Sequence, residues 1–489
     1  MIRAKVGEST YTFNNELEQY FANIKRNIIG DQLTFSTPYG QQKLLYADWT
    51  ASGRLYKNIE VKMSNTLGPY VGNTHTESNV TGTYMTKAYH EAKEIIKKHV
   101  NANENDIILF EGFGMTGAVN KLQRLLGLKD RRKELEHKAV VFVTHMEHHS
   151  NYLPWIETNA EVCMIQPDRY GDVDETELIK LIELYADREI KIGAFTACSN
   201  VTGRKTNYHQ LAKIMHQHGG LCFIDFAASA PYVSINMHPN EKTEELDAIF
   251  FSPHKFLGGP GTSGVLIMSK NLIESSVPDI PGGGTVDFTN PWGDLIYKED
   301  IEEREDGGTP GFLQAIKIAL CIQLKEKMGI ERIQAREREL ISLVMTELRK
   351  MEGINVFEEA NNDRLGIISF TCKEIHYDLV VRLLNDRFGI QVRGGCSCAG
   401  PYGHYLLDIT HEKSKKLIDE IKNGDFSHKP GWIRLSLHPT MSNEEAYYIL
   451  SAMKKILYYH KEWSKDYQYE NRSSTYRLHK NMKIDSLFG

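Results

Sequence analysis

A repeated alternation of short apolar runs with helical segments constrains the fold of this chain more than any other feature. The apolar runs have the length of strands and cover residues 107–110, 140–143, 190–197, 221–224 and 248–251. Helical segments stand between them, for example from Thr116 onward and over residues 208–218. This βαβα order favours a mostly parallel sheet with helices on both faces, so the predicted fold class is α/β.

The pattern changes after Pro310, and a chain of 489 residues is long enough for more than one domain. Helical segments then lead into alternating strands and helices, which is typical of an α+β unit. We predict four parts: an N-terminal segment (1–43) that packs on the small domain, a large α/β domain (44–310), a small α+β domain (311–459) and a polar C-terminal tail (460–489). A charged insertion (402–430) interrupts the small domain, and we expect a helix over its residues 412–422.

The charge and cysteine content of the chain argue against several classes of function. A net charge of −6 without any basic block disfavours nucleic acid as a partner. No apolar run reaches membrane-spanning length and the residues after Met1 are polar, so we expect neither a membrane segment nor a signal peptide. The seven cysteines are scattered and odd in number, which disfavours a disulfide framework and predicts a cytoplasmic protein.

Polar side chains end most of the predicted strands. They are Glu147, His148, Asn200, Asp225, His254 and Lys255. The carboxyl ends of parallel strands meet along one edge of a sheet, and α/β proteins bind ligands in the crevice outside that edge. We therefore expect a binding site at this edge.

Lys255 follows the apolar run 248–251 and precedes the turn Gly258-Gly259-Pro260-Gly261. A lysine amine in a partly dry crevice is suited to form a Schiff base with an aldehyde cofactor. The alternative is a surface lysine in a hairpin, and Lys255 alone does not decide between the two.

Three further features suit one aldehyde cofactor, pyridoxal phosphate (PLP). Asp225 can pair with the pyridine nitrogen and keep it protonated. Gly114-Met115-Thr116 opens a helix, where backbone N–H groups and a threonine hydroxyl can hold a phosphate. His148 can stack on the ring. Each feature has an ordinary alternative, namely a helix cap, a plain turn or a structural histidine, but their combination on a βαβ frame predicts PLP.

Six sequence phrases make the chain resemble a known family. They are Met146-Glu147-His148-His149-Ser150-Asn151, Ser199-Asn200-Val201-Thr202-Gly203, Ile224-Asp225, Ser252-Pro253-His254-Lys255, Gly308-Thr309-Pro310 and Arg393-Gly394-Gly395-Cys396-Ser397-Cys398-Ala399-Gly400-Pro401. In order and spacing they resemble the class V aminotransferase-fold PLP enzymes, in the cysteine desulfurase and selenocysteine lyase branch, over about residues 44–459. The resemblance implies PLP-dependent transferase fold type I, with a mostly parallel seven-stranded sheet in the large domain and a smaller α+β C-terminal domain.

The resemblance also implies roles for the residues around the cofactor ring. Lys255 would form the Schiff base and carry the proton at the substrate α-carbon. Asp225 would bind the ring nitrogen, His148 would stack on the ring, and Asn200 would lie near the phenolic oxygen.

The phosphate and substrate contacts follow from the same resemblance. The phosphate would be held by Met115, Thr116, Ser252 and His254. Thr309 would reach the phosphate of a neighbouring subunit, which implies a homodimer. Arg434 would clamp the carboxylate of an amino-acid substrate, a task suited to guanidinium geometry, and Asn200 and His75 would also lie at the substrate site. The sequence alone leaves open that Arg434 is an ordinary arginine at a strand edge.

Cys398 stands where the family carries its nucleophilic cysteine. In a desulfurase, this thiolate attacks the sulfur of L-cysteine, leaves a persulfide on the protein and releases L-alanine, and nearby positive charge, here from Arg393, favours the thiolate. The alternative is a small buried cysteine. Three alternatives remain open for Cys396. It could receive sulfur from Cys398, it could resolve the Cys398 persulfide by forming a disulfide, or it could have no role. No second ligand pair shows zinc-like spacing, so we expect no metal.

The leading hypothesis is a PLP-dependent, cysteine desulfurase-like carbon–sulfur lyase of sulfur metabolism that can pass sulfur to an acceptor protein. Ala228 stands where a glutamine is usual, Met115 replaces a usual threonine, and the insertion is long, so the substrate is less defined than the cofactor. The first alternative is a class V aminotransferase or amino-acid epimerase or lyase that uses Lys255 without a cysteine nucleophile. A non-catalytic sulfur carrier is disfavoured because Lys255 and Asp225 are both present.

Overall fold

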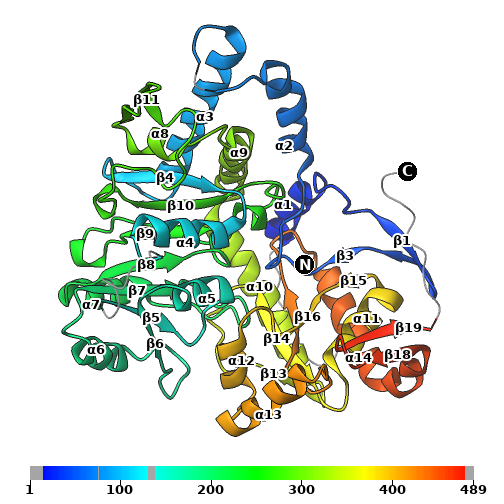
Figure 1. The fold of residues 1–489 in the computed structure, drawn as a ribbon. Coiled ribbons are helices and arrows are strands. Elements are labelled where there is room, and N and C mark those ends of the chain that lie inside the picture. Colours follow the sequence, from blue (N-terminus) through cyan, green and yellow to red (C-terminus); the bar gives the residue numbers. More distant parts are fainter. Residues whose placement is uncertain (1–14, 75, 130–137, 480–489) are drawn as a thin grey trace. The chain divides into compact units, whose positions relative to one another are not determined.

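The computed structural model describes residues 15–74, 76–129 and 138–479 (Figure 1). The chain divides into two compact units. One comprises Ala51–Ser199 and Lys205–Ile330 and contains the large sheet, and we call it the sheet unit. The other comprises Met1–Thr50, Asn200–Arg204 and Glu331–Gly489, and we call it the C-terminal unit.

The sheet unit is built on seven strands in the order β4-β10-β9-β8-β7-β5-β6. Their bounds are β4 (Asp106–Glu111), β5 (Ala139–Thr144), β6 (Glu161–Ile165), β7 (Ile190–Thr196), β8 (Leu221–Asp225), β9 (Ala248–Phe251) and β10 (Gly264–Ser269). The pairs are parallel except those of β10, which is antiparallel to both β4 and β9. The predicted mostly parallel seven-stranded sheet is confirmed.

Helices cover both faces of this sheet, which is why its central strands are continuous apolar runs (Figure 1). The helices nearest the strands are α4 (Gly114–Leu125), α5 (Leu153–Ile156), α6 (Glu175–Leu184) and α7 (Tyr208–Gln217). On one face, Leu122 of α4 and Trp155 of α5 join Val141 in a buried cluster. On the other face, the ring of Phe142 lies 6.3 Å from that of Tyr185, at the end of α6.

The sheet unit continues to Ile330, past the boundary expected near residue 310. Helix α9 (Phe312–Met328) explains the difference because its Phe312 and Ile316 pack with Met85 and Tyr89 of α3 (Val80–His99) in one buried cluster. The first helix after Pro310 is therefore still part of the sheet unit.

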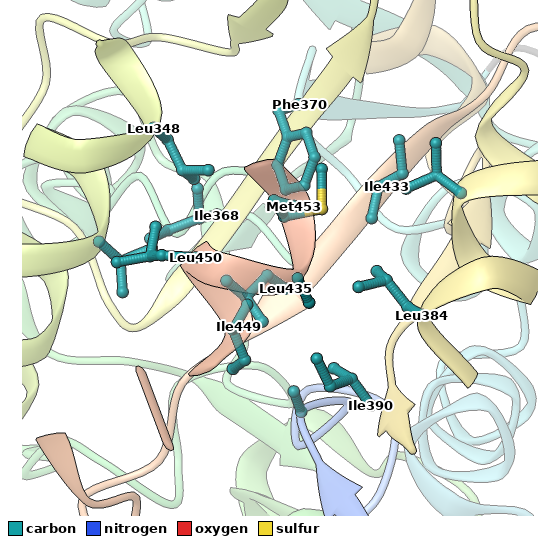
Figure 2. Close-up of a cluster of buried hydrophobic side chains, with 14 of the residues drawn as sticks. Leu348, Ile368, Phe370, Leu384, Ile390, Ile433, Leu435, Ile449, Leu450 and Met453 are labelled. Atoms are coloured by element: carbon teal, nitrogen blue, oxygen red, sulfur yellow. The ribbon is translucent and has the colours of Figure 1, made fainter. Parts of the chain in front are cut away.

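The C-terminal unit contains a four-stranded antiparallel sheet in the order β13-β14-β17-β16. Its strands and main helices are β13 (Ile354–Val356), β14 (Ile367–Cys372), β16 (Arg393–Gly395), β17 (Trp432–Ser436), α10 (Ile330–Arg349), α11 (Tyr377–Phe388) and α14 (Asn443–Trp463). Figure 2 shows the core between them, in which Phe370 and Leu435 from strands meet Leu384 and Met453 from helices. This unit is α+β, in agreement with the predicted fold class.

Both ends of the described chain pack on the C-terminal unit. In α1 (Asn15–Lys25), Glu18 accepts a hydrogen bond from the Asn443 N–H at 2.8 Å, at the start of α14. Strands β18 (Tyr467–Glu470) and β19 (Thr475–Leu478) form a hairpin within the segment expected to be a polar tail. The buried Tyr467 anchors this hairpin, since its hydroxyl donates to Asp386 Oδ2 at 2.9 Å.

The insertion at 402–430 is largely helical. It contains most of α12 (Gly400–Leu406) and all of α13 (His411–Lys422), and α13 matches the helix expected at 412–422. None of the residues of α13 is buried, so the helix presents a charged surface to solvent. No helix in the described ranges has both the length and the apolar character that a membrane crossing requires.

Candidate active site

Asp225 and Lys255 lie at the same edge of the large sheet. Asp225 is the last residue of β8, where it is in register with Thr196 of β7 and Phe250 of β9. Lys255 ends the short turn Pro253–Lys255 that follows β9. Parallel pairing of β8 with β9 therefore brings the two side chains to one end of the sheet.

The Asp225 carboxyl group is only 3% exposed, and its Oδ1 accepts a hydrogen bond from the Ala227 N–H at 2.7 Å. Burial raises the pKa of Asp225 to about 6, while that hydrogen bond and the positive charge of Lys255 act in the opposite direction. The Lys255 amine is thus within electrostatic reach of the carboxylate. A buried carboxylate of this kind can hold a proton on a nitrogen base placed against it.

Close backbone packing fixes the Lys255 turn. A Cβ added at Gly53 would lie 2.0 Å from the Phe256 carbonyl oxygen. A Cβ added at Gly259 would lie 1.9 Å from the Pro253 carbonyl oxygen. Because no real Cβ is found at such distances, both positions require glycine, and the turn has little freedom to shift.

The N-terminus of α4 forms a cradle of hydrogen-bond donors. Ser252 Oγ accepts a hydrogen bond from the Met115 N–H at 2.9 Å, and a Cβ added at Gly114 would lie 3.1 Å from the same oxygen. Thr116 Oγ1 donates to Ser150 Oγ at 2.7 Å, and the helix has no side-chain cap. The N–H groups at a helix N-terminus, the helix dipole and these hydroxyls suit a phosphate group.

His254 lies at the edge of this cradle, with its Cδ2 3.9 Å from the position of a Gly114 Cβ. Burial, and then the positive charge of Lys255, lowers the pKa of His254 to about 4. The ring is therefore neutral at pH 7 and can donate only one hydrogen bond to an anion.

His148 follows β5 and begins the short helical turn His149–Asn151. Its Nδ1 accepts a hydrogen bond from the Ser150 N–H at 3.1 Å, which fixes the ring. The preceding Glu147 is 1% exposed and accepts hydrogen bonds from Thr144 Oγ1 at 2.7 Å and from the Thr196 N–H at 2.9 Å. Glu147 thus ties the His148 loop to β7, a supporting role that its sequence context did not reveal.

A second group of predicted residues lies within the C-terminal unit. Arg434 of β17 is 3% exposed, and its Nη2 donates to Asp48 Oδ1 at 3.0 Å while its Nη1 donates to the Asn200 carbonyl oxygen at 3.2 Å. Arg393 donates to the other oxygen of Asp48, from Nε at 3.1 Å. Asp48 was not predicted as a site residue. It follows the strand-like run Leu44-Leu45-Tyr46 and precedes a turn of small residues, and a polar residue after an apolar run is the pattern that identified the other candidates.

Two buried polar atoms of this group have no hydrogen-bond partner in the described part of the chain. They are Arg434 Nε and Asn200 Oδ1. The Asn200 amide is otherwise engaged, since its Nδ2 donates to the Ser397 carbonyl oxygen at 2.8 Å. Buried groups left in this state are expected to bind a ligand or an ordered water molecule. A guanidinium N–H is a donor that suits an anionic ligand group, and an amide oxygen is an acceptor that suits a hydroxyl or N–H group.

Cys398 is exposed and stands on an ordered turn. The backbone φ angles of Ser397 and Cys398 are 51° and 56°, and the Ala399 N–H donates to the Cys396 carbonyl oxygen at 3.0 Å. Two positive φ angles inside a four-residue hydrogen bond are those of a type I′ turn, which residues other than glycine, asparagine and aspartate adopt at a cost. The charge of Arg434 interacts with Cys398, which places this thiol near the buried guanidinium.

The structure gives less information about the remaining predicted residues. His75 lies outside the described residues. Thr309 is exposed in the loop between α8 (Ile301–Glu305) and α9. Ala228 is buried three residues after Asp225. Across the described ranges, no group of three or more histidine, cysteine, aspartate or glutamate side chains could hold a metal ion.

Solved structures share this fold. The chain aligns over 92% of its length with 99% of the apo cysteine desulfurase from Thermococcus onnurineus, with a TM-score of 0.72 and 24% identity. It aligns over 91% of its length with 99% of the cysteine desulfurase CsdA from Escherichia coli, with a TM-score of 0.69 and 20% identity.

Curated sequences give a closer relationship. A protein of Halalkalibacterium halodurans named as a probable cysteine desulfurase is 30% identical over 373 residues, which are 75% of this chain and 86% of that protein. A protein of Staphylococcus aureus with the same name is 29% identical over 372 residues, covering 75% and 85% of the two chains. The model of the family described as Aminotransferase class-V matches residues 45–448. This chain therefore belongs to the class V aminotransferase family.

Proposed function

We propose that this protein is a PLP-dependent cysteine desulfurase that converts L-cysteine to L-alanine and leaves the sulfur as a persulfide on Cys398. The observation that carries the proposal is the exposed thiol of Cys398 on an ordered turn beside the charge of Arg434, in a class V chain whose relatives are named as cysteine desulfurases. The buried Asp225 and the neighbouring Lys255 supply the groups that PLP requires.

The residues of the sheet unit suit each part of the cofactor. When bound, PLP withdraws electrons from the substrate and stabilises negative charge at its α-carbon. Asp225 would hold the proton on the ring nitrogen, and His148 would stack on the ring. The phosphate would be held at the N-terminus of α4, by Met115, Thr116, Ser252 and His254.

The residues of the C-terminal unit suit the substrate. Arg434 would use its unpaired Nε, together with its Nη groups, to bind the substrate carboxylate, and the Asn200 amide would lie near the phenolic oxygen of the cofactor. Asp48 would hold the guanidinium in place. Lys255 would form the Schiff base with the cofactor and would move the proton at the substrate α-carbon, because its amine lies at the same edge of the sheet as Asp225.

Cys398 would carry the sulfur-transfer step. Its thiolate attacks the substrate sulfur, so that an S–S bond forms as the bond between that sulfur and Cβ breaks. The electron pair of the broken bond stays on the substrate, which is protonated and leaves as L-alanine. The persulfide of Cys398 is then available to an acceptor protein, and the exposed position of this residue suits such transfer.

We also propose a homodimer in which Thr309 contacts the phosphate bound by the other subunit. The hairpin of β11 (Val286–Thr289) and β12 (Leu295–Tyr297) exposes Phe288, Trp292 and Ile296, and Trp292 is 85% exposed. Apolar side chains gathered in this way are typical of a surface covered by a partner. All seven cysteines are free, which is compatible with the proposed location in the reducing cytoplasm.

A class V aminotransferase or an amino-acid epimerase or lyase that uses Lys255 alone is the second candidate. The buried Ala228 favours it, because this position lacks the hydrogen-bonding side chain that the desulfurase pattern carries.

A comparison of three variants separates the two functions. With L-cysteine, PLP and a thiol reductant, the wild-type protein should release alanine and sulfide in equal amounts. Cys398→Ala should keep the visible absorbance of the bound cofactor and lose sulfide release, whereas Lys255→Ala should lose both. Cys163→Ser, at a half-buried thiol on β6, is the matched control and should behave as wild type. Undiminished turnover by Cys398→Ala would favour the second candidate.

A further inference from the structure

Cys396 and Cys398 are separated by one residue, and both occupy the same type I′ turn. Cys396 is the first residue of the turn and is half-buried, while Cys398 is its third residue and is exposed. The reaction proposed above uses the Cys398 thiol alone and assigns no role to the Cys396 thiol.

The left-handed conformation of Ser397 decides how far apart the two cysteines are. In an extended chain, the Cα atoms of residues two apart are about 7 Å from one another, which is too far for a disulfide. With helical curvature of either hand, the same atoms are about 5.4 Å apart, close to the most common value for disulfides. The φ of 51° at Ser397 and the hydrogen bond that closes the turn therefore bring the Cα atoms of Cys396 and Cys398 into the range of separations found in disulfides.

Contacts on both sides hold this turn in place. The Asn200 Nδ2 donates to the Ser397 carbonyl oxygen at 2.8 Å. Before the turn, the backbone at Gly394 packs on the ring of Tyr377, where an added Cβ would lie 3.0 Å from Cδ2. The Tyr377 hydroxyl lies 3.1 Å from Ser474 Oγ of the C-terminal hairpin.

Cys396 is half-buried and lies near Tyr377. Burial is the largest cause of the raised pKa of Tyr377, and the Cys396 thiol adds to the rise, so the thiol and the phenol are neighbours. Cys396 is thus less exposed than Cys398, which stands two positions later in the chain.

We propose that Cys396 is the resolving thiol of this enzyme, a role that rests on the proposed desulfurase function. The Cys396 thiolate attacks Sγ of the Cys398 persulfide, so that a Cys396–Cys398 disulfide forms as the S–S bond of the persulfide breaks. The terminal sulfur takes the electron pair and leaves as hydrosulfide. A dithiol reductant then reduces the disulfide, forms its own disulfide, and returns both cysteines to thiols.

The tight turn favours this step over a transfer of the terminal sulfur to Cys396. A disulfide needs contact between the two Sγ atoms, whereas transfer of the terminal sulfur needs Cys396 Sγ to reach a sulfur that lies one S–S bond length, about 2 Å, beyond Cys398 Sγ. The short, exposed ring that results is of the kind that thiols reduce readily.

A single-turnover experiment tests the role. The holoenzyme receives one equivalent of L-cysteine without a thiol reductant, and the reaction is quenched with an alkylating agent. Alanine and sulfide are then measured, together with the mass of the peptide that contains both cysteines. The wild-type protein should release alanine and sulfide together and give a peptide two hydrogens lighter than the dithiol form. Cys396→Ser should release alanine with sulfide at background, and its peptide should be one sulfur heavier.

Two further variants test whether the turn geometry is needed and whether other thiols contribute. Ser397→Pro keeps both thiols but cannot adopt a positive φ, so it should also retain the persulfide. Cys163→Ser should match the wild type. A persulfide that persists on the wild-type protein, without a disulfide, would overturn the resolving role and leave the desulfurase function intact. A complete lack of alanine from every protein would overturn the desulfurase function itself, and the resolving role with it.

Discussion

Asp48 and Arg434 form a buried ion pair in which Arg434 Nη2 donates to Asp48 Oδ1 at 3.0 Å. The second oxygen of Asp48 is paired with Arg393, so one carboxylate orients two guanidinium groups. With Nη1 engaged by the Asn200 carbonyl oxygen, the Arg434 side chain has one fixed orientation and its Nε remains available. The ion pair therefore fixes the Arg434 guanidinium in the orientation in which the proposed carboxylate ligand would meet it.

We expect Asp48→Asn to weaken substrate binding more than it slows turnover. The variant keeps an oxygen acceptor but removes the charge that orients Arg434, and a charged hydrogen bond contributes roughly 1.5–3 kcal/mol. The KM for L-cysteine should rise by about tenfold or more, with a smaller fall in kcat. Steady-state kinetics measures both. Asp187→Asn, at an aspartate whose side chain is 75% exposed, is the control, and an unchanged KM in Asp48→Asn would refute the orienting role.

The affinity for PLP should depend on pH through Asp225. Burial raises the pKa of this carboxyl group to about 6 in the protein without cofactor, and only the ionised form pairs with a protonated ring nitrogen. Below pH 6 a proton must be removed before binding, so the affinity should fall by up to about tenfold for each pH unit. Above pH 6 this contribution should level off.

Titrations of the apoprotein with PLP, followed by absorbance, measure this dependence. Asp225→Asn should bind PLP more weakly and lack the step near pH 6. Protonation of the cofactor phosphate affects both proteins equally, so the difference between the two curves isolates Asp225. Parallel curves would show that Asp225 does not pair with the ring.

Glu147 should make the protein less stable as pH rises. Burial raises its pKa to about 8, above the ordinary value of 4.5, so the folded protein retains a proton that the unfolded chain releases. The contribution of this group to stability is therefore complete below pH 4.5 and is lost as pH rises toward 8. Across that window, the free energy of unfolding should fall by a few kcal/mol more in the wild type than in Glu147→Gln.

Denaturant unfolding at several pH values measures the Glu147 contribution. Glu189→Gln, at a glutamate whose side chain is 68% exposed, serves as the control and should follow the wild type. Equal slopes for the wild type and Glu147→Gln would contradict the raised pKa.

Gly53→Ala should disturb the Lys255 turn. The added Cβ would meet the Phe256 carbonyl oxygen at 2.0 Å, so the backbone that carries Lys255 has to move. We expect a loss of about 1–3 kcal/mol in stability and a marked fall in the fraction of protein that binds PLP. Gly283→Ala, at a glycine with no atom within 4 Å of an added Cβ, should leave both properties unchanged. Normal PLP loading of Gly53→Ala would show that the turn is not rigid.

The sequence was sufficient to predict the large sheet and the residues along its edge. Continuous apolar runs such as that of β5 identify strands covered on both faces, and parallel order then brings Asp225 and Lys255 to one end. These inferences depend on local patterns, which the printed sequence contains. The same patterns predicted α13 within one residue.

Features that depend on distant partners could not be predicted. The role of Asp48 comes from Arg434, which lies 386 positions later in the chain. The hairpin of β18 and β19 is polar by composition and is folded because Tyr467 reaches Asp386, so its sequence reads as a tail. The sheet unit ends after α9 because α9 packs on α3, and no local sequence signal marks this boundary.

The hydrogen bond from Asn200 to the Ser397 carbonyl oxygen spans 197 positions of the chain. This hydrogen bond restrains the turn that carries Cys398. The turn therefore has less freedom to move outward from the protein surface. Under the proposed function, an acceptor protein would therefore have to bring its own thiol to the surface of the enzyme. The charged helix α13, in which no residue is buried, is one surface of the C-terminal unit that is open to such a partner.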